Sequence, residues 1–141
     1  MDKAVLRSIL LIDDDSATNF IHKLFIQRVG LAQHIVMTTS ASDALEFLQG
    51  RGPLKGEIFP ELILLDLNMP NMNGEEFLEI YSKLTLKEGL PPVIIVSSSR
   101  EKENKIMSKF GIVKHYLSKP VRKEVWKDLG AELKKENVGN S

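Results

Sequence analysis

Residues 9–15 of the chain read Ile-Leu-Leu-Ile-Asp-Asp-Asp, four apolar residues followed directly by three acids. An unbroken apolar run of this kind is typical of a strand that is covered on both faces of a parallel sheet. Five short apolar runs occur, at residues 5–12, 34–38, 62–65, 93–96 and 116–117. The sequence therefore predicts five strands, the first of which ends in a cluster of acids.

Stretches of helical period separate and follow these runs, at residues 16–29, 42–49, 75–84, 102–110 and 122–136. In the first, Phe20 and Leu24, and Ile21 and Phe25, recur at four-residue spacing before Gly30, and we expect the phenylalanines of such stripes in the core. The alternation predicts an α/β domain of flavodoxin-like (βα)5 type. Its doubly wound parallel sheet of five strands would have the order 2-1-3-4-5, with helices on both faces.

The 141 residues, 43% of them hydrophobic, suit one domain of ordinary size. We expect residues 1–136 to form it and residues 137–141 to be a flexible C-terminal tail. Residues 50–60 contain three glycines and two prolines, which is typical of a surface loop. The absence of cysteine excludes disulfide frameworks and thiolate metal sites.

Charge and hydropathy restrict the partners. Nineteen basic and nineteen acidic residues cancel, so there is no overall basic field for nucleic acid or anionic lipid. No apolar stretch approaches the roughly 20 residues of a membrane helix, and the start has no signal-peptide core. We expect a cytoplasmic protein without nucleic-acid or membrane partners and without an effector domain after the last helix.

Polar residues that suit a binding site follow the first, third, fourth and fifth predicted strands. Ligands of open α/β sheets bind beyond the carboxyl ends of the strands, so these residues are candidates for the site. They are Asp13, Asp14 and Asp15 after the first strand, Asp66 after the third, Ser97 after the fourth and Lys119 after the fifth. The pattern brings carboxylates, a hydroxyl and an ammonium to one edge of the sheet.

Such a cluster of carboxylates predicts a bound cation. Two carboxylates about 4 Å apart repel by about 4 kcal/mol at an effective dielectric constant near 20. Mg²⁺ prefers a few carboxylate or carbonyl oxygens together with a substrate phosphate, which is the ligand set available here. One of the three consecutive acids is expected to cap the first helix, and that role needs only one of them.

The chain resembles a known family, the CheY-like receiver domains of bacterial two-component response regulators, over about residues 9–129. The motifs that carry the resemblance are Leu11-Ile12-Asp13-Asp14-Asp15, the segment 62–70 ending in Asp66-Leu67-Asn68-Met69-Pro70 with Gly74 beyond it, Val93-Ile94-Ile95-Val96-Ser97, and Lys119-Pro120.

The resemblance implies a single-domain regulator in which Asp66 accepts a phosphoryl group from a sensor histidine kinase or a histidine phosphotransfer protein. It implies that Asp13 and Asp14 hold Mg²⁺ together with Asp66 and the backbone carbonyl of Asn68, and that Lys119 pairs with the phosphoryl oxygens. It also implies no enzymatic activity beyond self-phosphorylation and self-dephosphorylation.

The same resemblance assigns a switch. Ser97 matches the family's switch hydroxyl and Tyr116 its switch aromatic, so an inward movement of Ser97 is expected to open room for Tyr116. Ser98 departs from the alanine that is common after the switch hydroxyl, which bears on the lifetime of the acyl phosphate. The Lys119–Pro120 peptide is usually cis in the family. The signal is expected to leave through a face formed by residues 102–110, 116–117 and 122–133.

Two other classes of protein are compatible with parts of the pattern. Asp13-x-Asp15 after an apolar run matches the first motif of haloacid-dehalogenase-type phosphatases, with Asp13 as nucleophile. That family needs a later acidic pair after its lysine, and only Glu124 and Asp128 follow here, within a predicted helix. A phosphorylation-silent adaptor is disfavoured because every residue expected for phosphorylation is present.

The three histidines, His22, His34 and His115, stand in no recognisable phosphohistidine setting. We expect them to have surface or packing roles, with the donor histidine on another protein.

Overall fold

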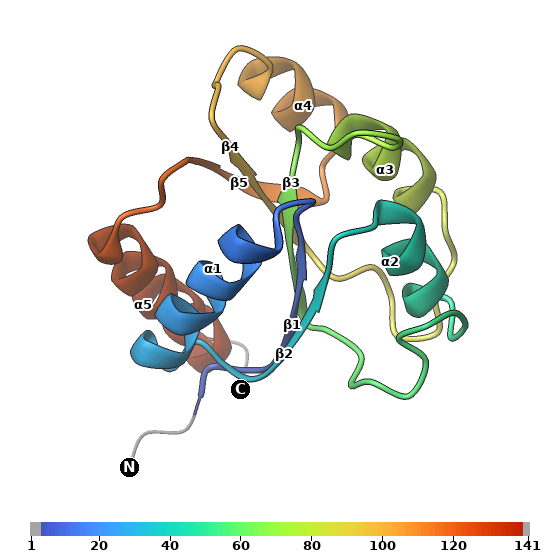
Figure 1. The fold of residues 1–141 in the computed structure, drawn as a ribbon. Coiled ribbons are helices and arrows are strands. Elements are labelled where there is room, and N and C mark those ends of the chain that lie inside the picture. The colour runs from blue at the N-terminus through green and yellow to red at the C-terminus, as the bar shows by residue number, and fades with distance from the viewer. Residues whose placement is uncertain (1–3, 140–141) are drawn as a thin grey trace.

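The computed structural model describes residues 4–139, in which five strands and five helices alternate (Figure 1). The strands are β1 (Leu6–Ile12), β2 (Ala32–Thr38), β3 (Leu62–Asp66), β4 (Val93–Ser97) and β5 (Val113–Ser118). The helices are α1 (Ser16–Val29), α2 (Ala41–Leu48), α3 (Gly74–Tyr81), α4 (Glu103–Lys109) and α5 (Lys123–Gly139).

The strands form one parallel sheet in the order β2-β1-β3-β4-β5, which confirms the predicted flavodoxin-like topology. Every residue of β3 and β4 is buried, as expected for strands in the middle of a sheet covered on both faces. Because all five strands run in the same direction, their carboxyl ends meet at one edge.

Helices cover both faces of the sheet, with α1 and α5 on one side and α2, α3 and α4 on the other (Figure 1). The α1/α5 side packs around Trp126, and the opposite side packs around Phe77 and Tyr81. In α4 only Ile106 is buried, in line with its sparse apolar pattern. Two apolar clusters therefore hold the sheet and leave its carboxyl edge to polar residues.

The ends of two elements differ from the prediction. β5 begins at Val113 rather than at residue 116, because an edge strand alternates buried and exposed residues and so lacks a continuous apolar run. α5 continues to Gly139. Residues 137–139, expected in the tail, are therefore helical, while Asn140 and Ser141 lie outside the described residues.

The orientation of α1 also differs from the prediction. Phe20, Ile21 and Leu24 are 54%, 51% and 46% exposed, so the expectation that Phe20 is a core residue is wrong. Phe25 is half-buried and stacks on Trp126 at 6.4 Å between ring centroids.

The face that α1 turns to the sheet carries Asn19, His22 and Ile26. The Asn19 side-chain amide donates to the backbone carbonyls of Asp13 and Thr38, each at 3.1 Å, and His22 packs on Trp126. The amide N–H groups of Asn19 thus have partners, whereas its buried Oδ1 has none among the described residues. With this partly polar face turned to the sheet, the apolar stripe of α1 is left on the surface.

Candidate functional site

Two buried carboxylates meet at the carboxyl edge of the sheet. Asp13 directly follows β1 and Asp66 ends β3, the neighbouring strand, and each is only 4% exposed. Asp14 is exposed beside them, and one carboxylate oxygen from each of the three residues lies within 4.8 Å of the others. The structure thus brings together the three acids that the sequence proposed as metal ligands.

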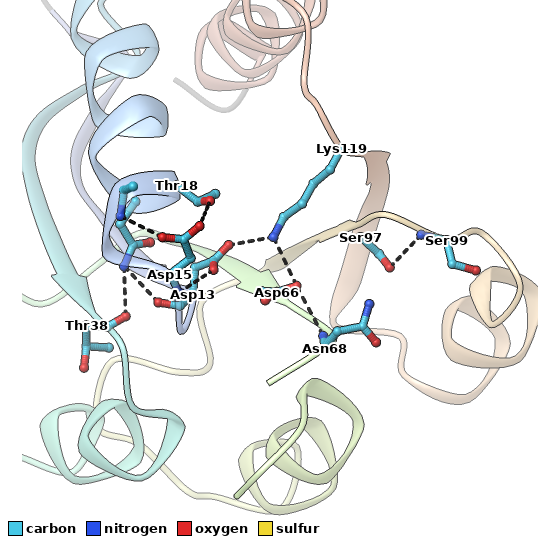
Figure 2. A network of polar contacts seen from close by, with 11 residues as sticks. Asp13, Asp15, Thr18, Thr38, Asp66, Asn68, Ser97, Ser99 and Lys119 are labelled. Carbon is cyan, nitrogen blue, oxygen red and sulfur yellow. Dashed lines mark hydrogen bonds and ion pairs between the residues drawn. The ribbon is translucent and has the colours of Figure 1, made fainter. Parts of the chain in front are cut away.

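Lys119 reaches this cluster from the end of β5 (Figure 2). Its Nζ lies 2.8 Å from Asp13 Oδ2 and 3.3 Å from Asp66 Oδ1, and its backbone N–H donates to the Ser97 carbonyl at 2.8 Å. Burial opposes the Lys119 charge, but the hydrogen bond to Asp13 and the charge of Asp66 outweigh it and raise the pKa of Lys119. The peptide between Lys119 and Pro120 is cis, as the family resemblance implied.

The carboxyl of Asp66 is electrostatically unfavourable in its ionised form. Burial, and then the neighbouring charge of Asp13, raise its pKa from 3.8 to about 6, although Lys119 acts in the opposite direction. One ammonium therefore does not balance the acids at this edge. Clustered carboxylate oxygens with excess negative charge are the donors that a hard divalent cation prefers, so the residues present fit Mg²⁺.

Asp15 has the capping role predicted for one of the three consecutive acids. Its side chain accepts hydrogen bonds from the Ala17 N–H and the Thr18 hydroxyl, at 3.0 and 2.9 Å. The Thr18 hydroxyl is the main reason why the pKa of Asp15 lies below its usual value. Of the three consecutive acids, only Asp13 and Asp14 are therefore available as metal ligands.

The loop after Asp66 is tightly packed. The Asn68 N–H donates to Asp66 Oδ1 at 3.2 Å, which places residue 68 beside the acid cluster. At Gly74 a Cβ atom would lie 2.7 Å from Leu67 Cα and 2.9 Å from the Asp66 carbonyl oxygen. Glycine is thus required where α3 begins, immediately behind Asp66.

Ser97 and Tyr116 both form hydrogen bonds with Ser99, in the loop after β4. Ser97 is 1% exposed, and its Oγ accepts from the Ser99 N–H at 3.2 Å (Figure 2). Tyr116 is 6% exposed, and its hydroxyl donates to the Ser99 carbonyl at 2.7 Å. The Tyr116 ring is therefore inward in this structure. The switch that the family resemblance implies, in which an inward movement of Ser97 opens room for Tyr116, stays a prediction.

None of the three histidines contributes to the acid cluster. His22 is buried against Trp126, and this burial lowers its pKa to about 4, so it packs as a neutral ring. His34 is exposed, and half-buried His115 lies 3.5 Å from Glu132.

Two residues near the site were not singled out by sequence reasoning. Asn19 ties the backbone of Asp13 to β2, and Arg100 contacts Tyr116. An asparagine inside a helix and an arginine in a loop carry no sequence signal of such contacts.

The sequence model of the response regulator receiver domain family matches residues 9–129 of this chain. The chain therefore belongs to this family of two-component signalling proteins. The cell cycle transcriptional regulator CtrA from Caulobacter vibrioides is 32% identical over 82% of this chain and 45% of its own length. Response regulator Rcp1 from Synechocystis is 31% identical over 79% of this chain and 75% of its own. This chain thus spans less than half the length of CtrA.

A solved two-component response regulator from Cytophaga hutchinsonii has the same fold, with a TM-score of 0.75 and 27% identity. The alignment covers 94% of this chain and 98% of that one. Within residues 4–139, no helix has the length and apolar character to cross a membrane.

Proposed function

We propose that this chain, with residues 1–136 as its receiver unit, is a phosphorylation switch in which Asp66 accepts a phosphoryl group. The donor would be a sensor histidine kinase or a histidine phosphotransfer protein. The observation that carries the proposal is the position of Asp66, a buried carboxylate at the end of a central strand, beside both an acidic pair and Lys119.

The chemistry requires one oxygen of Asp66 to attack phosphorus while the bond from phosphorus to the donor's histidine nitrogen breaks. Asp66 Oδ1 is held by the Asn68 N–H and Lys119, and Oδ2 has no hydrogen-bond partner among the described residues. We assign Oδ2 as the nucleophile. Phosphoryl transfer depends on in-line positioning and on cations near the equatorial oxygens, and Lys119 supplies one such charge.

Asp13, Asp14, Asp66 and the backbone carbonyl of Asn68 would hold Mg²⁺, with Asp14 as the exposed member of the set. When bound, the ion supplies positive charge that stabilises the transferring phosphoryl oxygens. Receiver domains in general are not enzymes that turn over a separate substrate, and we assign to this chain only its own phosphorylation and dephosphorylation.

Two surfaces would serve the two partners. The exposed apolar face of α1, formed by Phe20, Ile21 and Leu24, belongs to the helix that starts directly after the acid-bearing loop. A protein that presents a phosphohistidine to Asp66 must approach this edge, and we assign the α1 face to that donor. The output surface is the one formed by residues 102–110, 116–117 and 122–133, and we place the protein in the cytoplasm.

The proposal is tested by changing single charges beside Asp66. Asp14→Asn removes an exposed acid of the cluster without touching the pair between Asp13 and Lys119. We expect the Mg²⁺ concentration for half-maximal phosphorylation by a small phosphodonor to rise about tenfold. The matched control is Asp15→Asn, which removes the same charge one residue away and keeps a good capping residue, so its Mg²⁺ dependence should stay near the wild-type value.

Equal effects of both substitutions would mean that net charge, and not a metal site, controls the reaction. No phosphorylation of the wild-type protein at any Mg²⁺ concentration would favour the silent adaptor.

A further inference from the structure

Arg100 lies in the loop between β4 and α4 and contacts β5 at three places. Its Nη1 donates to Ser118 Oγ at 2.7 Å, and its Nη2 donates to the Tyr116 backbone carbonyl at 3.1 Å. Its guanidinium carbon lies 5.5 Å from the centroid of the Tyr116 ring, within the range of a cation–π contact. The Arg100 side chain thus contacts both the backbone and the ring of Tyr116, the switch aromatic. It also contacts Ser118, the residue before Lys119.

The direction of the Arg100 side chain is fixed from the other side by Glu103, in the first turn of α4. Arg100 Nε and Nη2 donate to the two carboxylate oxygens of Glu103 at 2.7 and 2.8 Å. This two-pronged geometry uses the planar fork of a guanidinium, which a lysine cannot reproduce. The contact therefore orients the remaining N–H groups of Arg100 toward β5.

The same loop connects Arg100 to Ser97. The Ser99 N–H donates to Ser97 Oγ, and the Ser99 carbonyl accepts from the Tyr116 hydroxyl. If Ser97 Oγ turned toward a phosphoryl group on Asp66, the Ser99 N–H would lose its acceptor. Ser99, the residue before Arg100, would then be the first to change its contacts.

We propose that Arg100 is a positioning residue that holds Tyr116 in its buried orientation and ties the Lys119-bearing end of β5 to the loop after Ser97. Its role in signalling rests on the proposed function of Asp66. In this chain a change at Ser97 reaches β5 through Ser99 and Arg100, while Tyr116 stays inward. Signalling would then not depend mainly on rotation of the Tyr116 ring between a buried and an exposed orientation.

Arg100 is half exposed, so each of its contacts is weak by itself. Together they fix one ring, and their loss should change the ratio of buried to rotated Tyr116 by about tenfold. That change is measurable because the chain has only two tyrosines. Tyr81, fully buried with its hydroxyl bonded to the Pro91 carbonyl, provides an internal reference.

The experiment is fluorine NMR of the full chain labelled with 3-fluorotyrosine, without a phosphodonor. In Arg100→Met, which keeps side-chain bulk but loses charge and donors, we expect the Tyr116 resonance to shift toward a solvent-exposed position or to split. The Tyr81 resonance should not move. Arg100→Lys, which keeps the charge but lacks the fork, should give a smaller change in the same direction.

Arg51→Met is the matched control, because Arg51, an exposed residue of the loop after α2, also pairs with a glutamate, Glu46 of α2. It should leave both resonances unchanged. A Tyr116 resonance in Arg100→Met that matches the wild type, or an equal shift of Tyr81, would overturn the assignment.

Addition of beryllofluoride and Mg²⁺ then separates this inference from the proposed function, because bound beryllofluoride has its own fluorine signals. With binding retained, the Tyr116 resonance should change little in the wild type and more in Arg100→Met. A large Tyr116 change in the wild type would contradict the inference. Failure of the wild type to bind beryllofluoride would instead count against Asp66 as the acceptor and leave the resting Tyr116 comparison valid.

Discussion

Leu65 and Asp66 are neighbours on β3, both buried, and they serve the molecule in opposite ways. Leu65 is fully buried within the apolar cluster under α2, α3 and α4. Asp66 is buried at the edge, where burial and Asp13 penalise its charge. The sheet interior thus provides stability, and its carboxyl edge holds a group whose ionised form reduces that stability. Substitutions on the two sides of this boundary should change the free energy of unfolding in opposite directions.

The largest effect is expected for that adjacent pair. Leu65→Ala should lower the free energy of unfolding by about 3 kcal/mol, since it leaves a cavity in a packed core. Asp66→Asn should raise it by about 1 kcal/mol in metal-free buffer at pH 8, because it removes the penalised charge but also the attraction of Lys119. Urea denaturation of both variants measures the two values.

The pH dependence gives the sign of the Asp66 effect. The folded-state pKa is raised from 3.8 to about 6, so the folded protein keeps a proton that the unfolded chain has released in this interval. The contribution of Asp66 is therefore fully favourable below about pH 4 and is lost as the pH rises through about 6. The advantage of Asp66→Asn should grow over the same window and then stay constant. An advantage that is constant from pH 4 to 8 would mean that the pKa of Asp66 is not raised.

A loss of stability smaller than that of Leu65→Ala is expected at Gly74, which lies between the apolar core and the acid cluster. Gly74→Ala forces a Cβ against Leu67 and the Asp66 carbonyl, which should cost about 2 kcal/mol and also slow phosphorylation by a small phosphodonor. Gly130→Ala in α5, where a Cβ meets nothing within 4 Å, should instead stabilise the protein by roughly 0.5–1 kcal/mol. Unchanged phosphorylation in Gly74→Ala would show that the loop behind Asp66 adjusts without moving the carboxylate.

The smallest effect on stability is expected on the surface of α1. Phe20→Ser with Leu24→Ser should change the unfolding free energy by less than about 1 kcal/mol, since both side chains are about half exposed. Phosphotransfer from a phosphorylated histidine phosphotransfer protein should slow at least about tenfold, with the small-phosphodonor rate unchanged. Ile80→Ser on α3, also exposed, is the control and should affect neither rate. Equal slowing by Ile80→Ser would remove the assignment of the α1 face to the donor.

The sheet and the acid cluster could be predicted from sequence because each depends on a local pattern. The central strands are continuous apolar runs, and Asp13, Asp66, Ser97 and Lys119 each stand at or just beyond a strand end. The face of α1 could not be predicted, because the buried side is fixed by partners distant in sequence, such as Trp126 for His22.

The orientation of Tyr116 depends on tertiary contacts for the same reason. Arg100 is a polar loop residue in sequence, and its contacts with Tyr116 and Ser118 exist only once β4 and β5 are paired. A family motif assigns Tyr116 a role but does not state where its ring lies.

The central claim is that Asp66, and no other residue, carries the phosphoryl group. The most direct measurement is to phosphorylate the protein with a small phosphodonor and Mg²⁺, and to locate the adduct by mass spectrometry of proteolytic fragments. We expect a single adduct on the fragment that contains Asp66, and none in Asp66→Asn. An adduct on Asp13 would contradict the account and favour a phosphatase of the haloacid-dehalogenase type, and labelling that persists in Asp66→Asn would contradict it as well.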